Sequence, residues 1–320
     1  MSGALSVSHQ TGVGASSAPR ARFGGLLRGE LRKLAGLRTA WVIAGVMTVA
    51  VIFLQLILAA SPQLSTQLRE APLDSYAQAV SGDVAIVRIL GGIFTLIIAA
   101  HLIGLEYQQG TIRILLGRGV GRLQLLGAQA LALALTAMAF IIVESLIEAG
   151  FLWGISVSAG GASQPWRALS GEFWVDVGYF ALYLVINAGV TLLLGVAAAV
   201  VGRSLAFGLT VGLTWFAVDN LLLQALRLLA QVTHSQFWVN LSGLLLGPLL
   251  NRLPDYILPP YHVTVQTAHG PVLMTHTMSG FGGLPLISVS APHALLIIGL
   301  WSALFVAVAI TITARRDIAN

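Results

Sequence analysis

The chain has 320 residues, of which 17 are Lys or Arg and 12 are Asp or Glu, so charged residues make up only 9% of it. Soluble domains carry about 25% charged residues. The hydrophobic fraction is 57% and the mean hydropathy is +0.87, which excludes an ordinary soluble protein and indicates a polytopic membrane protein. Because the chain contains no cysteine, a structural disulfide, a Cys-ligated zinc site and an iron–sulfur cluster are excluded as well.

Six apolar runs are long enough to cross a bilayer, and they predict an all-α polytopic membrane protein with six transmembrane helices. Residues 1–19, which precede the first run, are small and polar, and we expect them to form a disordered tail. The first run is too long for the apolar core of a cleaved signal peptide, so we expect it to be retained. The six runs are Ala40–Ala60, Val84–Leu105, Leu123–Gly150, Val177–Val201, Leu205–Leu229 and Ala294–Thr313.

Basic residues gather on one side of these spans. An even number of spans puts both termini on the same side of the membrane. If that side is the cytoplasm, most Lys and Arg residues are cytoplasmic, as the positive-inside rule requires. Segment 293–320 then consists of the sixth span and a cytoplasmic C-terminus. We therefore expect a multi-pass protein of the cell membrane. The net charge of +5 reflects this topology and indicates no nucleic-acid partner.

Segment 20–39 is expected to form an interfacial amphipathic helix before the first span. Apolar residues from Phe23 to Leu34 recur there at helical spacing, and Arg and Lys residues lie between them. The alternative is a basic flank that only fixes the orientation of the first span. Spans one to five, with the connecting loop 106–122, then occupy 40–229.

Segment 230–292, between spans five and six, is predicted to be a structured cap on the outer side. Phe237–Leu250 is apolar but too short to span, which is typical of a re-entrant or interfacial segment. In Tyr261–Thr277, β-branched residues flank a His-Gly-Pro turn, which predicts a small β-hairpin. The outer segment is therefore expected to be partly β.

Motifs of catalysis are absent from the sequence. A P-loop needs a lysine that reaches the terminal phosphates from a glycine-rich turn, and the one lysine, Lys33, follows an arginine instead. Serine-hydrolase, zinc-protease and dinucleotide motifs are also missing. We expect a non-catalytic chain without its own cofactor, so that any ATP is hydrolysed by another polypeptide.

The link between spans two and three carries the most informative pattern, Glu106-x-x-x-Gly110-Thr111-x-Arg113. Gly110 and Thr111 permit a turn, and a short apolar helix from Ile112 to Leu116 follows. Together with Glu30-Leu31-x-Lys33-Leu34 near the N-terminus and the six-span layout, this pattern resembles the ABC-2 type permeases of ATP-binding-cassette transporters. The outer segment 230–292 is longer than the re-entrant element of many members.

The resemblance implies a permease subunit, expected to work as an exporter, that pairs with a second copy and with an ATPase subunit that binds ATP and Mg²⁺. The turn after span two would be the coupling helix that docks on the ATPase, and Glu106 and Arg113 match its acidic and basic positions. We expect these two side chains to brace the helix against span two. The residues implied in coupling are Glu106, Gly110, Thr111, Ile112, Arg113, Ile114, Leu115 and Leu116.

Charged residues inside spans are further candidates. Asp219 lies roughly 21 Å along span five from Leu205, and Arg88 lies at a matching depth in span two. Three interpretations remain open: a structural ion pair, a role in the substrate path or gating, and an Asp that reaches water. Glu144 and Glu148 share one helix face, and counting from Leu123 places them near the outer boundary as solvated vestibule carboxylates.

Gly208-x-x-x-Gly212 in span five permits close helix packing. We favour a homodimer contact there, with packing inside the chain as the alternative.

Five histidines lie in the outer segment, and Met274-Thr-His276-Thr-Met278 has ligand types that suit Cu(I). Exposed strand residues explain this pattern more simply, so no metal is predicted. Two other function classes stay open: an ion-gradient-driven secondary transporter, and a membrane scaffold or enzyme that uses the outer histidine cluster. The sequence shows one candidate carboxylate and no internal repeat for the former.

Overall fold

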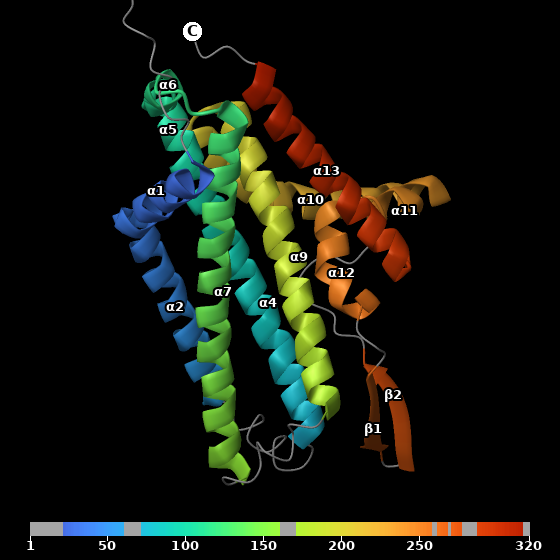
Figure 1. Cartoon of the computed structure of the whole chain (residues 1–320). Coiled ribbons are helices and arrows are strands. Elements are labelled where there is room, and N and C mark those ends of the chain that lie inside the picture. Colours follow the sequence, from blue (N-terminus) through green and yellow to red (C-terminus); the bar gives the residue numbers. More distant parts are fainter. Residues whose placement is uncertain are drawn as a thin grey trace, which may run out of the picture.

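The computed structural model describes residues 22–60, 72–160, 171–257, 261–267, 270–276 and 287–315, and it is a helical bundle (Figure 1). Six of its helices are long and apolar enough to cross a membrane, which confirms the predicted fold class. Their candidate spans are Arg38–Ile57, Gly82–Gln108, Arg122–Ser158, Val177–Gly202, Leu205–Thr233 and Ala291–Arg315. The elements are α1 (Phe23–Gly36), α2 (Arg38–Ala59), α4 (Pro72–Ala99), the π-helix η1 (Ala100–Gly104), α5 (Leu105–Gln108), α6 (Thr111–Gly117), α7 (Arg122–Gly160), α9 (Gly171–Gly202), α10 (Leu205–Thr233), α11 (Gln236–Ser242), α12 (Leu246–Ile257), β1 (Tyr261–Thr267), β2 (Gly270–His276) and α13 (Ala291–Arg315).

Helix α9 lies at the centre of the bundle and contacts α4, α7, α10, α12 and α13. Its C-terminal half contains the run Ala197-Ala198-Ala199, whose side chains are buried. Small side chains let neighbouring helices approach closely, which fits the position of this run inside the most buried of the six spans.

Helix α1 crosses the bundle at a steep angle to α2 and packs on α7 (Figure 1). Glu30 and Leu34 are buried on the face that it turns toward the bundle. The predicted N-terminal helix is therefore present, and its position at a membrane surface stays a prediction. We refer below to the α6 end of the bundle, where α5, α6, the start of α7 and the end of α13 lie (Figure 1).

The predicted single segment Phe237–Leu250 is divided in the structure. Helix α11 ends at Ser242 before Gly243, and α12 begins at Leu246. A proline at position 248 fits the first turn of α12, where the missing N–H would have no helical partner.

Helix α12 packs among the long helices of the bundle. Its leucines are almost completely buried against α9, α10 and α13: Leu246, Leu249, Leu250 and Leu253. This packing is compatible with the re-entrant interpretation of the apolar run, and the outer cap formed by segment 230–292 stays a prediction. The one-sided leucine pattern of α12 is typical of a helix that packs against a core.

Strands β1 and β2 pair antiparallel, with Tyr261 opposite His276 and Thr267 opposite Gly270. Their location on the outer side stays a prediction. Met278, which the copper interpretation used, and His269 of the predicted turn lie outside the described residues, as does the predicted tail 1–19.

Candidate coupling site and intramembrane polar groups

A tight reversal separates α5 from α6. Gly110 has φ 70°, a left-handed conformation that glycine adopts without steric cost. The Thr111 hydroxyl donates a hydrogen bond to the Glu106 carbonyl at 3.1 Å and closes the turn. The predicted short helix Ile112–Leu116 lies within α6, and this turn fixes its direction.

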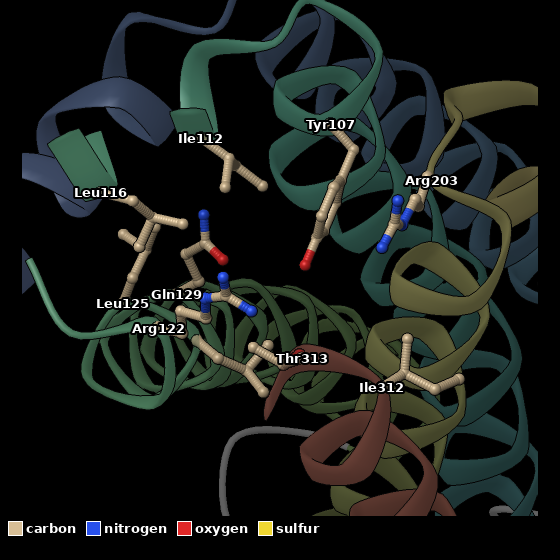
Figure 2. Close-up of a pocket in the computed structure, with 10 residues that line it drawn as sticks. Tyr107, Ile112, Leu116, Arg122, Leu125, Gln129, Arg203, Ile312 and Thr313 are labelled. Carbon is tan, nitrogen blue, oxygen red and sulfur yellow. The ribbon is translucent and has the colours of Figure 1, made fainter. Parts of the chain in front are cut away.

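Helix α6 buries one edge and exposes the other. Ile112 is only 5% exposed, and together with Leu116 it lines a cavity of about 20 Å³ against α7 and the last turn of α13 (Figure 2). Ile114 is 59% exposed, and Arg113 beside it is also exposed. The exposed edge offers an apolar side chain and a cation at the α6 end of the bundle.

Glu106 connects three helices at the base of this reversal. Its Oε1 accepts a hydrogen bond from the Lys33 Nζ of α1 at 2.5 Å, and its Oε2 accepts one from the Gln129 Nε2 of α7 at 2.7 Å. The cation that binds Glu106 is therefore Lys33, and the predicted brace between Glu106 and Arg113 is wrong. Spacing along the chain pointed to Arg113, but that side chain faces outward on α6.

Lys33 also pairs with Glu30 on its own helix at 2.7 Å. Burial raises the pKa of Glu30 above its ordinary value, because the hydrogen bond from Lys33 offsets desolvation only in part. Burial acts to lower the pKa of Lys33, but the hydrogen bonds to Glu106 and Glu30 outweigh it and raise that pKa. The ammonium group is thus held in its charged form between two carboxylates.

The α5 helix is also fixed from the side of α9 and α10. A Cβ on Gly104 would lie 2.8 Å from the Ser204 carbonyl oxygen, so the backbones touch at this glycine. The Arg203 guanidinium lies 5.8 Å from the centre of the Tyr107 ring, and the Gln108 side chain accepts a hydrogen bond from the Leu205 amide. The base of α6 is therefore connected to the α9–α10 turn as well as to α1 and α7.

Asp219 and Arg88 both contact α12. The Asp219 carboxylate accepts a hydrogen bond from the Gly247 amide, and Arg88 donates one to the Asn251 side chain, one helical turn further along α12. Asp219 and Arg88 are both buried within the bundle, and each is only 7% exposed. The direct ion pair between Asp219 and Arg88 stays a prediction, and the contacts that the structure shows run through α12.

The prediction of solvated vestibule carboxylates is wrong for Glu144 and Glu148, because both are buried. The Thr48 hydroxyl of α2 donates a hydrogen bond to Glu144. Thr48 lies only about 15 Å along α2 from Arg38, which places Glu144 near the middle of a bilayer about 30 Å thick. The count from Leu123 failed because α7 has 39 residues, about twice the number that crosses a bilayer, so the start of the helix does not mark the membrane boundary.

Asp83 of α4 completes an acidic group with these two glutamates, close enough for its charge to act on Glu148. The Asp83 carboxylate accepts a hydrogen bond from Gln55 Nε2 at 2.6 Å. The three carboxylates thus lie between α2, α4 and α7, inside the bundle.

Gly208 and Gly212 pack inside the chain. A Cβ on Gly208 would lie 3.2 Å from Ala100, and one on Gly212 would lie 3.0 Å from Leu96. The favoured assignment of these glycines to a homodimer contact is therefore wrong, and the alternative of intrachain packing holds. The face of α10 that carries them is covered by α4 and η1.

Comparison with models of known protein families gives a match over most of the chain. A family model described as ABC-2 family transporter protein matches residues 26–318, from within α1 to beyond the end of α13. No curated protein matches the chain.

Proposed function

Because the chain belongs to the ABC-2 family of transporter proteins, we propose that it is the permease subunit of an ATP-binding-cassette transporter. A separate ATPase subunit binds ATP and Mg²⁺, and the permease moves the substrate, in the direction of export. Both termini and the α6 end of the bundle face the cytoplasm of a cell membrane. The family membership and the six spans support this proposal.

The observation that carries the coupling role is the exposed edge of α6. Ile114 offers an apolar side chain that a groove on the ATPase can bury, and each Å² of buried apolar area contributes about 25 cal/mol. Arg113 beside it adds a cation at the rim of the same contact. Coupling also needs a firm base, which the Lys33–Glu106–Gln129 contacts supply.

Movement imposed on α6 would reach the spans along two routes. One passes from Glu106 to α1 and α7, and the other from Tyr107 and Gln108 to the α9–α10 turn. The π-helix η1, directly before α5, is the kind of local irregularity that is frequent at functional sites. Two permease copies would complete the transporter, and the weakly buried spans of α2, α10 and α13 leave apolar faces for lipid or a second copy.

A second candidate function is favoured by the buried acidic group Asp83, Glu144 and Glu148. Carboxylates within spans are typical of transporters driven by an ion gradient. This alternative requires no ATPase and predicts uptake or efflux by the chain alone.

Copurification decides between the two. The full chain is expressed in its native membrane and isolated in mild detergent, and its partners are identified by mass spectrometry. We expect a polypeptide with a Walker A motif to accompany the wild-type chain and Arg227→Ala, a control in exposed α10, and to be lost with Ile114→Asp. A folded wild-type chain that transports in vesicles without any ATPase would contradict the proposal and support the alternative.

A further inference from the structure

A cavity of about 250 Å³ lies between α4, α9, α10 and α12. Its volume is far larger than a single water needs and approaches the lower end of ligand pockets. Polar side chains from all four helices line it: Arg88, Asn187, Thr191, Asn220 and Asn251. Polar groups within membrane spans are energetically costly, so their concentration around one cavity points to a function.

The charge at this cavity favours an anion. Of the described residues that line it, Arg88 alone carries a charge, and Asp219 is bound at the start of α12 rather than among the lining residues. Arg88 donates a hydrogen bond to the Asn251 side-chain oxygen, which holds the guanidinium in place and leaves the Asn251 amide group as a donor. A planar guanidinium flanked by amide donors is a recognition site for carboxylate and phosphate oxygens.

Thr191 supplies a second, independent observation. Its side chain is 1% exposed, and its hydroxyl has no hydrogen-bond partner among the described residues although it lines the cavity. A buried hydroxyl without a partner is unfavourable, and a bound polar ligand would provide the missing hydrogen bond. Gly92 faces it, and a Cβ there would lie 3.8 Å from the Thr191 hydroxyl oxygen, so the glycine keeps the space beside Thr191 open.

The rest of the wall is apolar and reaches the side of the bundle. Ile89 of α4 and Leu213 of α10 line the cavity, and they are 40% and 42% exposed. Within a membrane these side chains face lipid, so a ligand with a hydrocarbon chain can place its polar end in the cavity and its tail between α4 and α10.

We propose that this cavity binds the oxyanion end of an anionic amphiphile, a carboxylate or phosphate joined to a hydrocarbon chain. Arg88 binds the oxyanion, and Thr191 and the asparagine amides provide further hydrogen bonds. The ligand comes either from the bilayer, as an acidic phospholipid, or from a single-chain amphiphile that the protein carries.

The test uses native mass spectrometry of the full chain in neutral detergent, without an ATPase, so that it is independent of the proposed function. Oleate, oleoyl lysophosphatidate and dioleoyl phosphatidate are titrated, with the uncharged monoolein as the control ligand. We expect one oxyanion amphiphile per chain, bound at least about tenfold more tightly than monoolein. Binding of the two-chain lipid alone assigns the site to the bilayer, and binding of the single-chain ligands assigns it to a carried amphiphile.

Three variants locate the site. Arg88→Gln should abolish the preference for oxyanions, Thr191→Val should weaken binding a few-fold, and Gly92→Leu should block binding of every ligand by filling the cavity. Arg227→Gln removes the same charge from an exposed position of α10 and should leave binding unchanged. Equal affinity for oleate and monoolein, or unchanged binding in folded Thr191→Val and Gly92→Leu, would overturn the proposal even where Arg88→Gln fails to fold.

Discussion

Lys33 of α1 and Glu106 of α5 are 73 positions apart in the sequence, and their charged groups lie 2.5 Å from each other. This pair connects the N-terminal helix to the base of α6. It gives the proposed coupling helix a support that does not depend on α6 itself.

Removing this pair should weaken the attachment of α1. Lys33→Met leaves the Glu106 carboxylate, which is 12% exposed, with Gln129 as its remaining hydrogen-bond donor. We expect a cost of about 1 kcal/mol, because the Lys33 side chain is 42% exposed and water screens the pair in part. The effects of Lys33→Met and Glu106→Gln on thermal unfolding in detergent should be less than additive. The control Arg32→Met removes the same charge from an exposed neighbour and should leave the midpoint nearly unchanged. Strict additivity of the two variants would show that the contact contributes nothing.

Glu30 should make stability depend on pH. Its pKa is raised in the folded protein, mainly by burial, so the folded state holds the proton more tightly than the unfolded chain. The resulting stabilisation is fully present below the unfolded pKa and is lost as pH rises through the folded pKa. Two titratable groups, Lys33 and Glu106, face Glu30. The raised pKa of Lys33 changes stability only in the alkaline range, so its effect on stability is separate from that of Glu30.

We therefore expect the unfolding temperature of the wild type to fall relative to that of Glu30→Gln as pH rises from about 4 to about 7. Parallel curves for the two proteins would contradict this expectation.

Glu148→Gln should stabilise the protein. Glu148 is buried next to Asp83 and Glu144, and its Oε1 has no hydrogen-bond partner among the described residues. An amide keeps the shape and is neutral without having to take up a proton, so we expect a gain of about 1–2 kcal/mol in the free energy of unfolding. Thr48→Val, which removes the hydrogen bond to Glu144, should lower stability instead. If Glu148→Gln lowers the unfolding temperature, the carboxylate has a partner that this account lacks.

Gly247→Ala should disturb the contact between α10 and α12. The added Cβ would lie 2.7 Å from the Asp219 carboxylate oxygen that accepts the Gly247 amide hydrogen bond, so that contact must open. We expect a loss of about 1–3 kcal/mol. Gly299→Ala in α13 meets no atom within 4 Å, and a helical alanine there should be neutral or slightly stabilising. Equal unfolding temperatures for the two alanine variants would contradict the observed geometry.

Sequence reasoning found the features that depend on composition and local pattern. The six spans follow from long apolar runs, and the Gly110 turn follows from a glycine and a threonine after Glu106. Sequence reasoning missed the hydrogen-bond partners that come from distant helices. Neither the spacing of residues along the chain nor their estimated depth in the membrane identifies which of several cations or donors binds a carboxylate. Lys33 could have been found as the one lysine of the chain, placed within the N-terminal motif.

Gln129, Gly247 and Asn251 carry no comparable signal in the sequence. Depth counting failed for Glu144 because the 39 residues of α7 are about twice the number that crosses a bilayer, and a single sequence does not show where so long a helix enters it.

Site-specific crosslinking from α6 tests the coupling role most directly. Because the chain contains no cysteine, Ile114→Cys introduces the only thiol, to which a short photo-crosslinker is attached in membranes that contain the ATPase. The matched control is Ser158→Cys, an exposed position near the opposite end of α7. We predict that illumination joins the Ile114→Cys chain to the ATPase in high yield and that Ser158→Cys gives no such product. A crosslink from Ser158→Cys, or none from Ile114→Cys in an assembled transporter, would contradict the assignment of α6 as the coupling helix.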